Sequence, residues 1–170
     1  SCALAGPWPS TCLLGSSDSE LVMFGVVRKG LRATLGCPRA TQDLALNTRN
    51  RQLAIDKYDY GPLNPQQPSL KYWKKLASRW NKKVTWQDIQ EAKSARCGNC
   101  VAFDISPRME RCMPGPVTQA GKLGFCWMHD FKCASLRTCA TWAGGGPITQ
   151  DSISYDWQRR KGGGGCRQLL

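Results

Sequence analysis

The residues best suited to chemistry are cysteines, and six of the chain's ten lie within residues 96–142 with the spacing C-x2-C-x11-C-x13-C-x6-C-x5-C. They are Cys97, Cys100, Cys112, Cys126, Cys133 and Cys139, and the chain's single histidine, His129, lies among them. Two cysteines separated by two residues can turn both sulfurs toward one point, as in loops that hold a metal ion or a cluster. Zinc ribbons, iron–sulfur clusters and redox motifs all use this pair, so the pair alone does not choose among them.

Three parts of this block resemble the high-potential iron–sulfur proteins. They are Cys97-Gly98-Asn99-Cys100, then Cys112 leading into Pro114-Gly115, and finally Gly124-Phe125-Cys126. The resemblance covers residues 97–128 and implies a [4Fe–4S] cluster that cycles between its two more oxidised states. The ligands it implies are Cys97, Cys100, Cys112 and Cys126. Since Cys133, Cys139 and His129 have no counterpart in the family's pattern, they stay open as less favoured ligands.

A broader stretch, residues 47–148, is similar to small proteins of tailed bacteriophages that are themselves described as similar to high-potential iron–sulfur proteins. This likeness implies a viral origin more than a known activity. Because a minimal electron carrier needs no long basic extensions, we expect a structural component of a virion whose basic arms contact DNA or other virion proteins, including further copies of itself. A chain that is not phage-encoded is expected in the cytoplasm. The alternative role that the resemblance implies is a one-electron carrier.

Other uses of the cysteines remain open at this point. Structural zinc accepts four cysteines, or three cysteines and a histidine, and such a zinc-stapled module could bind nucleic acid. A disulfide cage is a further alternative, although the chain shows no secretory signal and disulfides are rarer without export. We expect no enzyme, because no paired carboxylates or catalytic motif are visible. Asp104, Glu110 and Asp130 are interpreted as surface charges.

The chain has 170 residues and a net charge of +12. Residues 43–96 carry eleven basic and five acidic residues, whereas residues 97–142 carry a net charge of only +2. This basic segment indicates either a solvated surface or a site for an acidic partner such as nucleic acid. The apolar run at 21–27 is too short to cross a membrane and is predicted to be a strand.

We therefore predict a small, loop-rich α+β domain stapled by a metal cluster, with extended N- and C-terminal arms. Residues 1–42 form the N-terminal arm, 43–96 the basic helical segment, 97–148 the cluster domain and 149–170 a flexible tail. The remaining cysteines, Cys2, Cys12, Cys37 and Cys166, show no ligand spacing.

Several helices are expected before the cysteine block. A short helix is predicted at 49–57, followed by a proline-rich connector at 58–68. Ser69 can cap a helix over 70–80, whose Tyr72, Trp73, Leu76 and Trp80 share one face and pack on the core. Thr85 with Asp88 predicts a capping box opening a second helix to about Ser94. These two helices would form a hairpin that covers the cluster, and five aromatic residues would exclude water from it: Phe103, Phe125, Trp127, Phe131 and Trp142.

Overall fold

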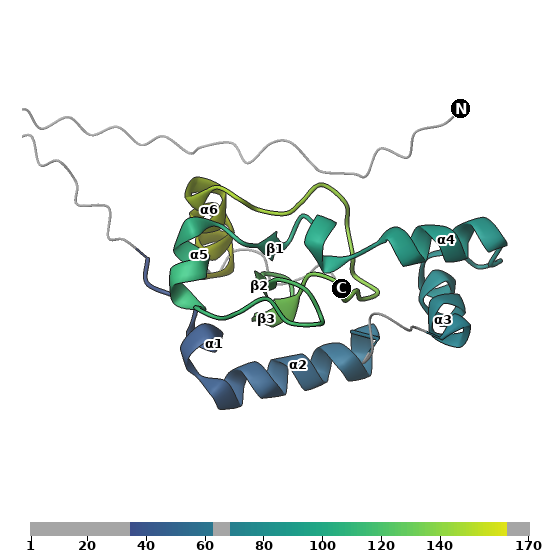
Figure 1. Ribbon diagram of the computed structural model, residues 1–170, viewed down its shortest axis with the longest axis horizontal. Coiled ribbons are helices and arrows are strands. Elements are labelled where there is room, and N and C mark those ends of the chain that lie inside the picture. The colour runs from purple at the N-terminus through teal and green to yellow at the C-terminus, as the bar shows by residue number, and fades with distance from the viewer. Residues whose placement is uncertain (1–34, 63–68, 163–170) are drawn as a thin grey trace, which may run out of the picture. The chain divides into compact units, whose positions relative to one another are not determined.

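A three-stranded antiparallel sheet lies in the middle of the computed structural model, which describes residues 35–62 and 69–162 (Figure 1). The strands are β1 (Phe103–Asp104), β2 (Leu123–Cys126) and β3 (Phe131–Ala134), in that order across the sheet. β2 pairs with β3 along its whole length. The expected mixture of helices and strands is confirmed. The strand expected at 21–27, and Cys2, Cys12 and Cys166, lie outside the described residues.

The helices of the described residues are α1 (Arg39–Gln42), α2 (Leu44–Tyr58), α3 (Leu70–Trp80), α4 (Trp86–Ser94), a 3-10 turn η1 (Cys97–Asn99), α5 (Pro107–Cys112) and α6 (Asp151–Gly162). The caps predicted for α3 and α4 are confirmed: the Ser69 hydroxyl accepts the Tyr72 N–H, and Thr85 forms a reciprocal capping box with Asp88. α2 is longer than predicted because the Asp43 carboxylate accepts the Leu46 N–H and starts the helix earlier.

α2 packs against β3 through polar side chains as well as apolar ones. The Asn47 side-chain oxygen accepts the Lys132 N–H at 2.8 Å, and the Asn50 amide donates to the Asp130 carbonyl at 2.8 Å. These bonds satisfy backbone groups at the β2–β3 hairpin that would otherwise lack partners. They also explain why the apolar residues of α2 do not gather into one stripe.

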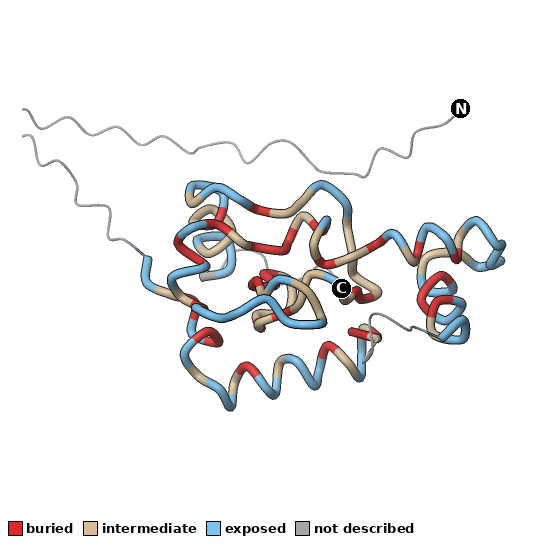
Figure 2. Tube along the Cα trace, in the orientation of Figure 1, coloured by how far each residue is buried: buried red, intermediate tan, exposed pale blue. Residues whose placement is uncertain are grey.

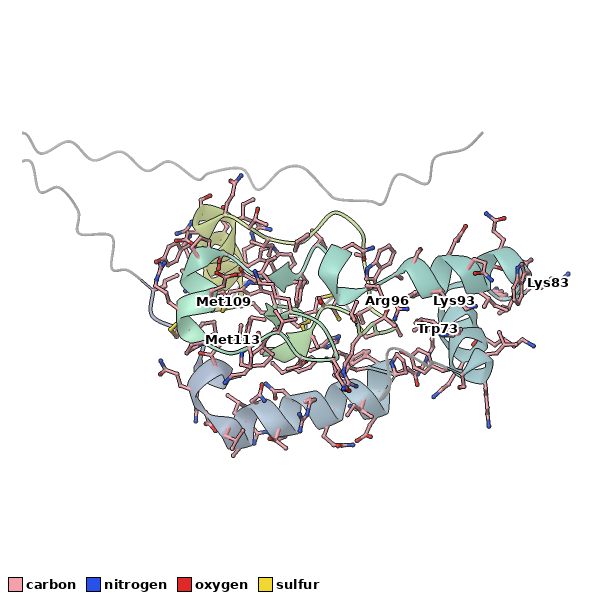
Figure 3. The ribbon with its side chains drawn as sticks, viewed as in Figure 1. Trp73, Lys83, Lys93, Arg96, Met109 and Met113 are labelled. Atoms are coloured by element: carbon pink, nitrogen blue, oxygen red, sulfur yellow. A yellow bond between two sulfur atoms is a disulfide. The ribbon has the colours of Figure 1, made fainter. Side chains whose placement is uncertain are left out.

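α3 and α4 form the expected hairpin, with a small core of their own. Its buried residues are Trp73, Leu76, Ala77, Ile89 and Ala92. Buried residues therefore lie on the facing sides of the two helices as well as around the sheet (Figure 2). The Arg96 guanidinium lies 4.6 Å from the centre of the Trp73 ring, where the hairpin joins the body (Figure 3). The prediction that the Trp-bearing face of α3 is buried is confirmed, but the face packs against α4 in a core separate from the one that holds the cysteines. The expectation that this hairpin covers the cysteines is therefore not borne out.

The prediction of a flexible C-terminal tail is wrong for residues 151–162, which form α6. Arg108 on α5 explains the difference. Its guanidinium is buried, donates to Ser154 at 2.9 Å and to the Gln158 side chain, and lies 4.0 Å from the Tyr155 ring centre. One charged side chain therefore ties three residues of α6 to α5, a contact that local sequence does not reveal.

Asp59 connects α2 to α3. It ends α2 with a positive φ of 54°, and its side chain, 5% exposed, forms ion pairs with Lys75 and Arg79. Burial raises the pKa of Asp59, but the hydrogen bonds and charges of Lys75 and Arg79 outweigh burial and lower the pKa below its usual 3.8. The carboxylate is therefore ionised throughout the neutral and mildly acidic range.

Replacing Asp59 with Asn should lower the free energy of unfolding by about 2 kcal/mol, because two cations lose their charged acceptor. Asn tolerates positive φ, so the backbone is not strained. Since the native pKa is depressed, this stabilisation is present above pH 3.8 and is lost only as pH falls through the lower native value. Urea unfolding at pH 5 and pH 8 should give the same difference between wild type and variant.

The matched control is Asp56→Asn, which removes an exposed carboxylate from the same helix. It should change stability by less than about 0.5 kcal/mol. Equal effects of the two substitutions would contradict the role given to Asp59.

Candidate metal centre

Five buried cysteines with free thiols occur in the described part of the chain. They are Cys97 on η1, Cys100 directly after it, Cys126 at the end of β2, Cys133 on β3, and Cys139 in the following loop. All five belong to the hydrophobic core around the sheet. The thiols in this core thus come from three separate segments of the chain: η1 with Cys100, the β2–β3 hairpin, and the loop that follows β3.

The thiols interact with one another. Cys133 lies close enough to Cys97 and Cys126 for its pKa to be affected by both thiols. Cys100 and Cys139 are each close enough to Cys97 and Cys126 for their charges to affect one another. Cys97 and Cys126 are therefore the shared neighbours of the other three thiols.

Backbone N–H groups donate to three of these sulfurs. Cys100 accepts from Ala102 and Ala143, Cys126 accepts from Met128 and His129, and Cys139 accepts from Thr141, whose hydroxyl also lies 3.3 Å from the sulfur. Such N–H groups favour the thiolate over the thiol, and they are a recurring feature of metal-bound cysteines. These backbone N–H groups therefore stabilise negative charge on the three sulfurs.

Burial acts in the opposite direction. It raises the pKa of Cys139 to about 12 and that of Cys133 well above the usual value, because a thiolate in a dry core lacks solvation. At Cys126 the hydrogen bond from Cys133, together with the backbone N–H groups, outweighs burial and lowers the pKa. The buried thiols of this site can therefore ionise together only when a positive charge lies close to their sulfurs.

Cys112, predicted as a ligand, is instead joined to Cys37 by a disulfide across a sequence separation of 75 residues. The structure therefore does not place it with Cys97, Cys100 and Cys126 as a free thiol. Two contacts hold the partner segment in place, since the carbonyl of Gly36 accepts from Arg108 at 3.1 Å and from Gln158 at 3.0 Å. Cys37, which showed no ligand spacing, thus has a structural role.

His129 lies at the edge of the thiol cluster. Its Nε2 is 2.7 Å from the Thr141 hydroxyl and 3.9 Å from the Cys139 sulfur, and its ring packs against Tyr58. Burial, assisted by the charge of Lys161, lowers the pKa of His129 to about 4. The imidazole is therefore neutral at pH 7 and is hydrogen-bonded to Thr141.

The aromatic residues expected around the cysteines share their core. Phe103, Phe125, Trp127 and Phe131 are buried there, and Trp142 packs against it half-exposed. Asp104, interpreted from the sequence as a surface charge, is fully buried, and that interpretation is wrong. Its carboxylate accepts the Trp127 indole N–H at 2.8 Å and the Ser106 N–H at 2.9 Å, which compensates for its burial.

Gly98 and Gly146 have no side chain, and this lets neighbouring backbone segments pack closely against η1. A Cβ on Gly98 would lie 3.2 Å from the Ser135 carbonyl oxygen, and a Cβ on Gly146 only 1.7 Å from the Cys100 carbonyl oxygen. The segment around Gly146 also bonds to η1 through its N–H, 3.2 Å from the Asn99 carbonyl. The strand-like segment 143–148 thus passes directly against the Cys97–Cys100 turn.

Gly146→Ala should therefore destabilise the protein by about 3 kcal/mol, because backbone atoms on both sides must move to admit one methyl group. Gly115→Ala is the control, since a Cβ there would meet only the Leu123 side chain at an ordinary 3.7 Å. Its effect should stay below about 0.5 kcal/mol. Urea unfolding measures both, and a Gly146 variant as stable as the control would contradict the close approach.

Comparisons of the chain with protein-family models, with curated proteins and with solved structures found no significant match. The resemblances noted in the sequence therefore stay predictions.

Within residues 35–62 and 69–162, no three His, Cys, Asp or Glu side chains converge as the ligands of one metal ion do. No helix in the same ranges is long and apolar enough to span a membrane.

Cys133 and Cys139, the less favoured ligands in the sequence, are buried in the same core as Cys97, Cys100 and Cys126, whereas Cys112 is bonded to Cys37. A usable signal was present for Cys133, because it alternates with Phe131 along β3 and both side chains face the core. For Cys139 the signal was weaker: the following Thr141 can donate to a sulfur two residues earlier, as it does here. The Cys37–Cys112 disulfide had no local signal.

Proposed function

We propose that this chain binds a [4Fe–4S] cluster through four of the five clustered thiols, and that the cluster serves as a structural staple in a non-enzymatic component of a phage virion. The observation that supports the proposal is the burial of five thiols from three chain segments in one hydrophobic core, with backbone N–H groups donated to three of the sulfurs. The virion assignment is supported by the sequence likeness over residues 47–148.

The donor chemistry fits such a group. A [4Fe–4S] cluster takes one thiolate on each iron, and its irons supply the positive charge that buried thiolates need. N–H groups and a largely apolar surrounding of aromatic residues are the features that tune such clusters. When bound, the cluster would supply four strong bonds that join η1 to the β2–β3 hairpin, and also to the loop at Cys139 where Cys139 is the fourth ligand.

The contacts among the thiols suggest which four are used. Cys133 lies close to both Cys97 and Cys126, so these three form the centre of the candidate ligand set. The fourth ligand is then Cys100 or Cys139, each of which neighbours Cys97 and Cys126 and accepts backbone N–H groups. Cys112 is left out of this set because it is bonded to Cys37.

A structural role is consistent with the small size of the sheet. The three strands together contain only ten residues, so few sheet hydrogen bonds hold these segments together and cross-links between them would add stability. The disulfide between Cys37 and Cys112 supplies one cross-link on the side of α5. A cluster joining the remaining segments would supply the other.

Metal and acid-labile sulfide analysis of protein purified without oxygen should give about four irons and four sulfides per chain, with a broad brown absorbance. One zinc per chain without colour would contradict the cluster and favour the zinc-stapled alternative. Voltammetry of the brown protein then separates the roles, because a reversible one-electron couple at an accessible potential would indicate an electron carrier and contradict a purely structural staple.

Single Cys→Ser substitutions should identify the ligands. Cys97→Ser, Cys126→Ser and Cys133→Ser should each abolish the brown colour and the iron, whereas only one of Cys100→Ser and Cys139→Ser should do so. The reason is that serine replaces a thiolate with a far poorer iron ligand, so the protein loses one of its four anchoring bonds.

The matched control is the double variant Cys37→Ser, Cys112→Ser, which removes two cysteines without touching the cluster. It should keep the iron and the colour while lowering the free energy of unfolding by about 2–4 kcal/mol through loss of the disulfide. Loss of iron in this double variant, with iron retained in Cys133→Ser, would restore the family pattern with Cys112 as a ligand.

A further inference from the structure

A second site is a cavity of about 440 Å³ between the C-terminal half of α2 and the β2–β3 hairpin. Three of its lining residues are cations, Arg51, Lys132 and Arg137, and none of the lining residues in the described ranges is Asp or Glu. Ile55, Tyr60 and Leu123 form its apolar walls. Its volume lies in the range of small-ligand sites, which combine apolar walls with a few charged groups.

The cations come from three different elements, so the cavity is not simply the basic face of one helix. Arg51 lies on α2, Lys132 on β3 and Arg137 in the loop after β3. Neither Arg51 nor Lys132 forms an ion pair within the described ranges. Arg137 is oriented by the Pro62 carbonyl, to which it donates at 2.9 Å, and by the Tyr60 ring beneath it.

The nearest acidic residue along α2 is already engaged. Asp56 accepts the Gln52 amide at 2.8 Å and does not line the cavity. Arg51 and Lys132 thus place two positive charges beside Arg137 without an ion pair of their own among the described residues, and such charges repel one another unless an anion joins them. Arginine is also the side chain best shaped to hold a planar or tetrahedral oxyanion by paired N–H groups.

We propose that this cavity binds a small, multiply charged oxyanion, carried by a phosphate or carboxylate compound. A concave site of this volume fits a small molecule rather than a nucleic-acid strand, which needs an open groove along its backbone. Cys133 also lines the cavity, so the bound anion would lie beside one of the clustered thiols. The inference does not depend on what metal those thiols hold.

Isothermal titration calorimetry of the full chain tests this, with pyrophosphate and citrate as probes and sodium chloride of equal ionic strength as the reference. Saturable binding of one probe per chain is expected, and the probe that binds more tightly distinguishes a phosphate site from a carboxylate site. No binding of either probe beyond the chloride reference would overturn the proposal.

Substitution of the two unpaired cations locates the site. Arg51→Ala and Lys132→Ala should each weaken binding roughly tenfold, since each removes a charged hydrogen-bond donor from the anion. Both side chains reach solvent, so the fold should be retained, and circular dichroism and iron content check this. Lys83→Ala, on the exposed turn between α3 and α4, is the control and should bind as wild type does. Equal binding by wild type and the Arg51, Lys132 double variant would overturn the assignment.

Discussion

The burial of five thiols in one small core is the constraint on which the rest of this structure depends. A sulfur that ionises away from water loses its solvation, so each thiolate needs hydrogen-bond donors or a nearby cation. The turns at Cys100, Cys126 and Cys139 supply backbone donors, and the same turns set the paths of the chain around the sheet. The fold and the candidate site therefore depend on the same contacts, because the cysteines that form the site are also part of the hydrophobic core.

The elements around this core are attached by polar contacts, buried or partly buried, as well as by apolar ones. α6 depends on the Arg108 guanidinium, α2 on the amides of Asn47 and Asn50, and the α3–α4 hairpin on Asp59. Such contacts are directional, so they specify how a helix is oriented as well as whether it is attached. They therefore add orientation to the packing that the hydrophobic residues of the two cores supply.

The features that could be predicted from the sequence depend on interactions between residues that are close together in the chain. The start of α3 at Ser69 and of α4 at Thr85 depends on hydrogen bonds that span only three residues, so both were recognisable. The buried face of α3 follows from helical spacing of its aromatic and apolar residues. The close approach at Gly98 was also predictable, because a glycine inside a C-x2-C turn leaves room for a second backbone segment.

The sequence by itself thus determined the caps, the helical hairpin, the mixed α and β composition and the gathering of cysteines as the chemically important residues. Only the tertiary structure decided that Cys112 bonds to Cys37, that Cys133 lies near both Cys97 and Cys126, that Asp104 is buried, and that residues 151–162 form a helix. Each of these depends on a partner far away in the sequence. Cysteine spacing limits which sulfurs can meet, but the choice among them is made by the packing of the sheet against the helices.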